Sequence, residues 1–568
     1  MLFKILTILP LYYLVLTSNI SSPPTFIDPL NIPISISGSF GELRTSNFHS
    51  GIDIKTYGKT GYDVFAIADG FISRIFVSSV GYGKALYISH DNGYTSVYAH
   101  LDGFGIQIEE YIRAKQYESK SYYVNIFPDS ELMRIKQGDV IGYSGNSGSS
   151  MGPHLHFEVR ETSTQETINP MLFNFNILDT IEPIFHNLYL YQFGTGSSFN
   201  RSAYSMVKQS KEYRLKDIDT IVTYGTIGLA AHVTDRINGS NNVCGINQLK
   251  VEVNNKITYM LNLSKISFSE VKYIQSHSDY WLVKNQNRRI HKCFVNSGNR
   301  FSNYSNLINN GYLNIAHDSI YNVTITSYDG YKNSSQMSFV IKGDHKAKKY
   351  FPKMSHIQQW SPNITNVYND EFVTITASKN ALYDTLYFNY SILNQTKDIL
   401  TKRYLIGDSN TALHQNINVK IKNIKIPENL IKKLVTVEVS EKTMSVLDTK
   451  PKYNGIDVET NISTFGTIAF TCDTTPPKII PINIHNGIDI TSLKSIKFKI
   501  TDDLSGINNY DGYINDKWIL FEYDAKNNLL VYNIDKQMPT GSDLELRIEI
   551  TDKVGNKATK YIQLAKPV

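Results

Sequence analysis

The 568-residue sequence contains few cysteines and few charged residues, and it has no apolar segment long enough to cross a membrane. Its three cysteines exclude a cysteine-rich zinc array and a disulfide-dense secreted scaffold. Charged residues make up 19% of the chain, whereas soluble proteins average roughly 25%, and aromatic residues reach 12%. This composition excludes a disordered chain, a coiled coil and a charge-rich nucleic-acid binder, so we expect no nucleic-acid partner.

The length predicts three or four domains, at roughly 150 residues per domain. Residues 23–178 carry a net charge of −5, and residues 179–568 carry +9. The excess positive charge therefore lies outside the segment that holds the candidate catalytic residues described below.

The N-terminus has the pattern of a secretory signal peptide. Lys4 precedes an apolar run at 5–16, and small and polar residues follow it up to Ser22. Twelve apolar residues are too few to span a bilayer, which needs about 20. We therefore assign 1–22 as a signal peptide, with an uncleaved N-terminal anchor as the alternative. We expect a periplasmic or cell-surface protein, with no stable membrane insertion after signal cleavage.

The rest of the chain reads as mainly β, with antiparallel strands. Short apolar runs at 64–67, 71–77, 85–88 and 94–99 are separated by turn sequences, and the last turn is Asp91-Asn92-Gly93. Helical spacing occurs at 107–120, and a second β region covers 140–159. Leucines and isoleucines alternate with charged residues at 544–550, which indicates a strand with one exposed face.

The C-terminal part contains an internal repeat. The turn sequences that begin at Asp179, Val233 and Asp329 return in the same order at Asp473, Ile500 and Asp552. These two segments resemble bacterial immunoglobulin-like domains. We therefore expect two or three β-sandwich modules, at 179–345, 346–472 and 473–568, after a first domain at 23–178; the 346–472 segment aligns with neither repeat. Cys244 and Cys293 fall in one module, and either a disulfide or two buried thiols is compatible with that placement.

Five residues in the first domain have the types and spacing of a metal-dependent catalytic site. His154 and His156 are two apart and share one face of a strand. His49 and Asp53 are four apart and share a face if their segment is extended, and His100 lies between the two pairs. Two imidazoles and one carboxylate form the ligand set of a catalytic zinc that keeps one position open. The chain has no His-Glu-x-x-His helix, so the thermolysin-type arrangement is excluded.

These residues resemble the lysostaphin-type (LytM-like) zinc endopeptidases, whose signatures are His-x-x-x-Asp and His-x-His with a further histidine between them. The resemblance covers residues 35–172. It implies Zn²⁺ held by His49, Asp53 and His156, with His100 and His154 as catalytic residues that handle the proton and the tetrahedral intermediate. It also implies an antiparallel β-sheet domain and a substrate in the peptides of peptidoglycan.

Three neighbouring features receive separate predictions. Glu158 shares a strand face with His156 and is assigned a supporting role or a salt bridge, whereas His90 is assigned a structural role. The segment between Leu101 and Gly138 has 36 residues and is longer than the short connection expected in the family at this place. We hypothesise that this insert borders the substrate groove.

The sequence thus predicts a secreted zinc metalloendopeptidase that hydrolyses peptide cross-links of peptidoglycan with metal-activated water. Envelope proteins are possible further partners. Two alternatives remain open. The first is a non-catalytic regulator that binds and activates other wall hydrolases, and the second is a surface adhesin in which the β modules carry the function.

Overall fold

The computed structural model describes residues 25–565 apart from 195–198, 352–354, 441–442 and 542, so the predicted signal peptide lies outside the described residues. The described chain consists mostly of antiparallel β-sheets, which confirms the predicted fold class. None of its helices is both long and apolar enough for a membrane span. The α-helices are α1 (Ile106–Ser119), α2 (Ile274–His277) and α3 (Tyr280–Gln286). Short 3-10 helices are η1 (Pro170–Leu172), η2 (Val271–Tyr273), η3 (Asn309–Gly311), η4 (His345–Ala347) and η5 (Glu428–Lys433).

The first domain is built on one large sheet in which β11 lies between β2 and β6. The strands of this sheet are β1 (Ile36–Gly38), β2 (Ile52–Lys55), β11 (His154–Glu161), β6 (Tyr94–Leu101), β5 (Lys84–His90), β4 (Gly70–Val77), β8 (Val124–Ile126), β9 (Arg134–Ile135), β12 (Thr167–Ile168) and β20 (Lys265–Ile266). A smaller sheet contains β3 (Asp63–Phe65), β10 (Val140–Tyr143) and β7 (Gly103–Phe104). Since β20 comes from the following module, the large sheet joins two modules through backbone pairing with β12.

The alternating apolar runs of the sequence become these strands. The turn after β5 places Gly93 at φ +86°, a conformation that glycine adopts without the steric cost of a side chain. Alternate residues of each strand then face the buried core, which contains Ile88, Tyr98 and Phe157. The predicted helix at 107–120 is confirmed as α1, which buries Ile108 and Ile112.

The insert between Leu101 and Gly138 does not border the groove, contrary to our hypothesis. No described residue of this insert lies among those that line the groove at the histidines. Instead, Tyr117 on α1 donates a hydrogen bond to Asp535 at 2.9 Å, and its ring packs edge-on against Trp518. Tyr117 of the insert therefore contacts the C-terminal module.

The second module begins at β13 and forms a 12-stranded sheet system whose two parts share β14. Its strands are β13 (Ile184–Phe193), β14 (Phe199–Gln209), β15 (Glu212–Leu215), β16 (Thr220–Thr223), β17 (Gly225–Thr234), β18 (Gln248–Val253), β19 (Lys256–Asn262), β21 (His291–Lys292), β22 (Tyr304–Ser305), β23 (Leu313–Ile315), β24 (Ile320–Tyr328) and β25 (Ser334–Gly343). Cys244 and Cys293 are both buried free thiols, so they form no disulfide with each other.

Two further modules each enclose their own apolar core, the third module among three sheets and the fourth between two. The third contains β26 (Gln358–Trp360), β27 (Asn366–Asn369), β28 (Val373–Ala377), β29 (Leu386–Phe388), β30 (Tyr390–Leu393), β31 (Arg403–Ile406), β32 (Ile417–Ile421), β33 (Leu434–Val439), β34 (Met444–Asp448), β35 (Lys452–Tyr453), β36 (Val458–Ile462) and β37 (Gly466–Cys472). The fourth contains β38 (Lys478–Pro481), β39 (Ile488–Asp489), β40 (Ser495–Thr501), β41 (Ile507–Ile514), β42 (Lys517–Ile519), β43 (Glu522–Asp524), β44 (Leu529–Asn533), β45 (Asp543–Asp552) and β46 (Lys557–Ala565). The strand predicted at 544–550 is confirmed within β45.

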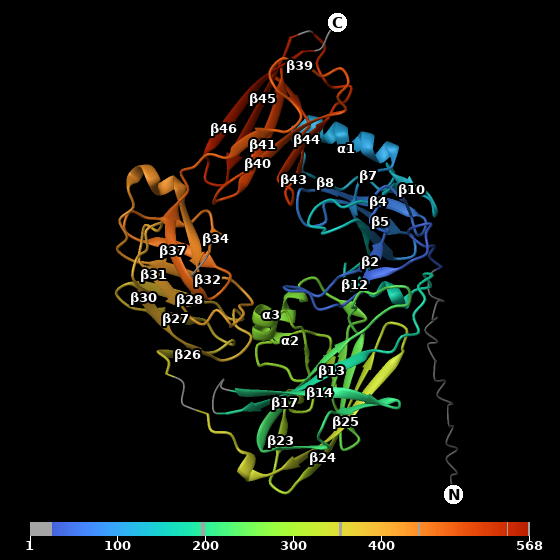
Figure 1. The fold of residues 1–568 in the computed structure, drawn as a ribbon, viewed down its shortest axis with the longest axis vertical. Coiled ribbons are helices and arrows are strands. Elements are labelled where there is room, and N and C mark those ends of the chain that lie inside the picture. Colours follow the sequence, from blue (N-terminus) through green and yellow to red (C-terminus); the bar gives the residue numbers. More distant parts are fainter. Residues whose placement is uncertain (1–24, 195–198, 352–354, 441–442, 542, 566–568) are drawn as a thin grey trace, which may run out of the picture.

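The four modules follow one another in a ring, so that the last module returns to the first (Figure 1). A salt bridge of 2.9 Å joins Lys84 on β5 to Glu522 on β43. The Lys526 ammonium, in the turn after β43, donates to the backbone carbonyls of Asn146 and Ser150. These polar contacts link the C-terminal module to the loop that leads into β11.

Candidate metal centre

The central strands of the first domain position three of the predicted site residues. On β11, His156 lies directly opposite Asp53 of β2, and on its other side it lies opposite Ala99 of β6. Residues that face each other across antiparallel strands project from the same face, so the His156 and Asp53 side chains meet. His49 lies in the loop before β2, and its backbone N–H donates to the carbonyl of Glu42 at 3.0 Å.

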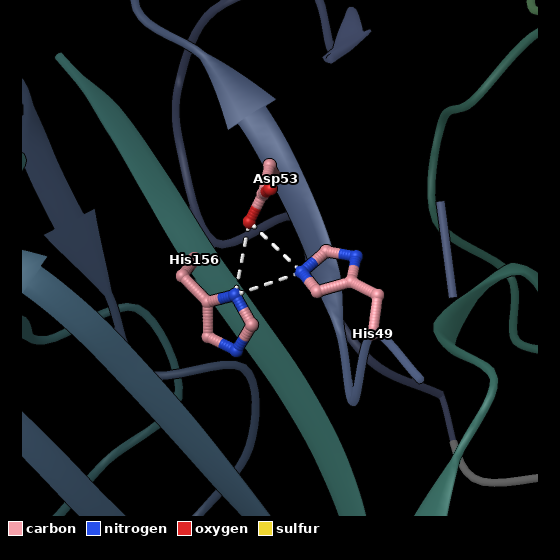
Figure 2. A group of neighbouring side chains, drawn as sticks. All are labelled: His49, Asp53 and His156. Atoms are coloured by element: carbon pink, nitrogen blue, oxygen red, sulfur yellow. Dashed lines mark hydrogen bonds and ion pairs between the residues drawn. The ribbon is translucent and has the colours of Figure 1, made fainter. Parts of the chain in front are cut away.

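The three side chains converge on one point (Figure 2). Asp53 Oδ1 lies 2.9 Å from His156 Nδ1 and 3.1 Å from His49 Nε2, and the two nitrogens are 3.1 Å apart. In a tetrahedral zinc site with ligands at about 2.0–2.1 Å, neighbouring donor atoms are about 3.3 Å apart. Two imidazole nitrogens and one carboxylate oxygen at these separations therefore fit a zinc ion.

Hydrogen bonds outside the cluster fix which nitrogen of each histidine faces its centre. The Nδ1 atom of His49 lies 2.8 Å from the carbonyl oxygen of Ser39, and the Nε2 atom of His156 lies 2.9 Å from Glu158 Oε1. These contacts leave His49 Nε2 and His156 Nδ1 toward Asp53. Histidines that bind metals are commonly oriented by an acceptor on the second ring nitrogen.

Burial and the neighbouring charges set the protonation of the cluster without an ion. Burial would raise the pKa of Asp53, but His49 and hydrogen bonds from the three nearby imidazoles hold it well below its usual range. Burial would lower the pKa of His156, yet hydrogen bonds to Asp53 and Glu158 raise it to about 9. Burial lowers the pKa of His49. Asp53 thus stays a charged carboxylate, and its negative charge favours a positive charge next to it.

Glu158 anchors the far side of His156. It is fully buried and accepts hydrogen bonds from Ser50 at 2.7 Å, from Tyr82 and from Arg160. Arg160 and the hydrogen bonds from His156 keep the pKa of Glu158 low, although burial opposes this effect. The carboxylate therefore stays charged, which suits the supporting role that strand parity predicted.

His154 and His100 lie beside the cluster. His154 Nε2 is 3.5 Å from Asp53 Oδ1, and the rings of His154 and His100 are 4.9 Å apart. The Nδ1 atoms of both rings lie near backbone carbonyl oxygens, at 2.8 Å from Gly152 and 2.9 Å from Ser147. His100 occupies the left-handed region at φ +61°, which side chains other than glycine seldom adopt and which is found at functional sites. The structure thus brings all five predicted residues together, while their roles stay predictions.

Arg44 is a neighbour of the site that no sequence pattern predicted. Its guanidinium donates to Asp53 Oδ2 at 2.7 Å, which leaves Oδ1 to face the histidines. Its position nine residues before Asp53 follows no strand or helix period, so only the folded loop reveals the contact. His90, in contrast, is buried away from the site and contacts Asp69 and Ser96, as its structural assignment requires.

A groove of about 1120 Å³ opens over the cluster, and two modules line it. Tyr57 and Met151 come from the first domain, whereas Asn242, Phe268 and Val271 come from the second module. The second module also supports the ligand loop, because Phe48, next to His49, is buried and stacks on Phe301 at 4.8 Å. The sequence offered no signal for this shared groove.

Comparison with known proteins agrees with this geometry. Residues 47–122 and 122–170 match the model of Peptidase family M23, and residues 358–473 match a Zu5-like domain. A DD-carboxypeptidase/endopeptidase Mpg of Neisseria meningitidis serogroup B is 35% identical over 150 residues, which are 26% of this chain and 28% of that protein. Lysostaphin of Staphylococcus staphylolyticus is 28% identical over 128 residues, which are 22% of each chain.

Solved structures also show similarity to a part of the chain. The catalytic domain of lysostaphin from Staphylococcus simulans has 24% sequence identity and a TM-score of 0.18, covering 24% of this chain and 90% of that one. A zinc containing peptidase from Vibrio cholerae has 23% identity and a TM-score of 0.18, covering 25% and 37%. Residues 47–170, which contain the ordered histidine and aspartate motifs, are thus similar to Peptidase family M23, and the chain spans about a quarter of the length of the curated relatives it matches.

Proposed function

We propose that this protein is a secreted zinc metalloendopeptidase that hydrolyses peptide cross-links of peptidoglycan. The single observation that carries the proposal is the convergence of His49, Asp53 and His156, with His100 and His154 beside them. Relatives named as an endopeptidase and as lysostaphin support the reaction class.

The ion has three defined ligands in this proposal. His49 Nε2, Asp53 Oδ1 and His156 Nδ1 would hold Zn²⁺, while Arg44 retains the second oxygen of Asp53. Bound zinc lowers the pKa of water to about 7 and polarises a carbonyl. Glu158 keeps the His156 ring in place through its Nε2 atom.

His100 and His154 would move the proton during hydrolysis. Because Nδ1 of His100 lies beside the backbone carbonyl of Ser147, its Nε2 is the nitrogen free to accept a proton, whereas His154 Nε2 faces Asp53 Oδ1 at 3.5 Å. The attacking water forms its bond to the scissile carbonyl carbon and gives a proton to one of these Nε2 atoms. The proton then passes to the departing amine as the C–N bond breaks. Burial and the neighbouring His156 and His154 lower the pKa of His100 to about 3, so this ring is neutral at neutral pH and would hold an accepted proton only briefly.

The groove indicates which substrate fits. An extended peptide can lie between the first domain and the second module, where Phe268, Val271 and Met151 offer apolar contacts. A cross-linked stem peptide has the extended shape and mixed polarity that such a groove accommodates. We therefore assign the second module a part in substrate binding.

The test is digestion of cross-linked sacculi by the chain without residues 1–22, with fragments identified by mass spectrometry. We expect cleavage that a chelator abolishes and Zn²⁺ restores. His156→Ala is expected to lose cleavage, whereas His485→Ala, at an exposed histidine in the fourth module, is expected to retain it. Cleavage that continues in chelator or in His156→Ala would contradict the metal mechanism. A cellular phenotype that survives His156→Ala would instead favour a regulator that docks on other hydrolases.

A further inference from the structure

Two clusters of three aspartates, all buried except the half-buried Asp502, lie outside the candidate metal centre, in the second and fourth modules. Asp179, Asp235 and Asp329 each place one carboxylate oxygen within 4.8 Å of the other two. Asp473, Asp502 and Asp552 do the same. These are the aspartates that the internal repeat aligns, so the same arrangement occurs twice in one chain.

The third aspartate of each cluster is held by the same turn. In the second module, Asp329 Oδ1 accepts from the backbone N–H groups of Tyr331 at 2.8 Å and Asn333 at 2.9 Å. In the fourth module, Asp552 Oδ1 accepts from Val554 at 3.0 Å and Asn556 at 2.8 Å. The matched spacing shows that both turns present a carboxylate to the same position.

An asparagine ties each turn to the first aspartate of its cluster. Asn333 Nδ2 donates to Asp329 Oδ2 at 2.7 Å and to the backbone carbonyl of Asp179 at 3.2 Å. Asn556 makes the equivalent pair of hydrogen bonds in the fourth module, at 2.6 Å and 2.9 Å. Each cluster is therefore a built structure, with its backbone fixed around the carboxylates.

Oxygen atoms in the second-module cluster lack hydrogen-bond partners. Asp235 is 1% exposed and Asp179 is 8% exposed, yet Asp235 Oδ1 and Asp179 Oδ2 are buried without any partner. Leaving a buried polar atom unsatisfied costs free energy, and for a charged group the cost is higher. Within the described part of the chain, no Lys, Arg or His forms an ion pair with these aspartates. Burial and the neighbouring carboxylates accordingly raise the pKa of Asp235 to about 8.

The fourth-module cluster has the same kind of unpaired atoms. Asp502 Oδ1 is buried without a partner, and so is the hydroxyl of Ser505, a residue that is 2% exposed. The backbone N–H of Ser505 donates to Asp473 Oδ2 at 2.9 Å, which places this residue at the cluster. Burial also raises the pKa of Asp502.

We propose that each aspartate cluster binds one calcium ion. All the converging atoms are oxygens, which are the ligands that hard cations prefer and that Ca²⁺ takes in flexible sets of six to eight. A divalent ion would bind the unpaired oxygens and remove the repulsion among three buried carboxylates. Backbone carbonyls and water would complete the coordination.

The position of each cluster gives the ion a structural role. Asp179 lies between the last element of the first domain, η1, and β13 of the second module. Asp473 lies between β37 of the third module and β38 of the fourth. Each ion would therefore join the start of a module to its body and fix the angle at which that module leaves the preceding one.

The test is to dialyse the Zn²⁺-loaded chain against Ca²⁺ and then to count the bound calcium by mass spectrometry of the metal ions. We expect two Ca²⁺ per wild-type chain, one in Asp235→Asn, one in Asp502→Asn and none in the double variant. Asp217→Asn, at an exposed aspartate of the second module, is the matched control and should keep two. At free Ca²⁺ 100-fold above the dissociation constant, each site should raise the folded-to-unfolded ratio about 100-fold.

Stability measurements distinguish a calcium site from a cluster whose carboxyl groups only share a proton. Asp235→Asn replaces a buried carboxyl group that lies beside two others with a neutral amide, so without Ca²⁺ the variant should melt at or above the wild-type temperature. With Ca²⁺ the order should reverse, because only the wild type gains an ion. A wild-type chain that binds no Ca²⁺, or equal binding in the double variant, would overturn the proposal. The wild-type count decides the question even if a variant fails to fold.

Discussion

Replacing Glu158 by glutamine should weaken zinc binding without removing any ligand. Glu158 is fully buried, accepts from His156 Nε2 at 2.9 Å and pairs with Arg160. Glutamine keeps the shape and one carbonyl oxygen, but it loses the charge that raises the basicity of His156. Changes to such supporting groups cost about 10–100-fold in metal affinity, or about 1.4–2.7 kcal/mol.

The assay is a competition between protein and a chromophoric chelator for Zn²⁺, combined with cleavage measured over a range of zinc concentrations. We expect cleavage by Glu158→Gln to recover when zinc is raised about 100-fold. Glu161 lies on the same strand as Glu158 and forms a partly exposed salt bridge with Lys265. Glu161→Gln should therefore show the zinc affinity and the cleavage of the wild type. Unchanged zinc affinity together with lost cleavage would refute the positioning role. Melting curves must show a folded variant, because Arg160 loses its buried counter-charge.

Three further predictions concern other parts of the molecule. Glu522→Gln removes one partner of the Lys84 salt bridge, so solution scattering should show an opened ring, whereas exposed Glu545→Gln should leave the scattering unchanged. Gly148 adopts φ +68°, and a methyl group added to it would lie 2.4 Å from the Gly81 carbonyl oxygen. Gly148→Ala should therefore lower both the melting temperature and the cleavage rate, and equal cleavage would contradict a tightly packed groove loop. Burial lowers the pKa of His277 well below its usual range and that of His291 to about 3, so the unfolded chain binds more protons between about pH 3 and 6.5. The free energy of unfolding should therefore fall as the pH falls through that window, by at most about 1.4 kcal/mol per histidine and pH unit, and melting curves should show a smaller fall in His291→Gln.

Local sequence patterns predicted much of the first domain. The alternation of apolar residues gave the strands around Tyr98 and Phe157, and the helical spacing gave α1. Strand parity placed His154, His156 and Glu158 on one face, because side chains two apart project together. The prediction that the insert between Leu101 and Gly138 borders the groove was wrong, because a helical pattern does not determine which surface the helix packs on. In the structure, that surface belongs to the C-terminal module.

The sequence by itself determined which side chains are present, the β period that orients them and the order of the histidine and aspartate motifs. Only the tertiary structure decided that Arg44 contacts Asp53, that the second module forms one wall of the groove, and that repeated aspartates gather in two buried clusters. The physical reason is the range of each interaction. Backbone geometry repeats every two residues along a strand and is set by the local sequence, whereas a contact across a folded loop or between distant modules depends on how the loops and sheets pack.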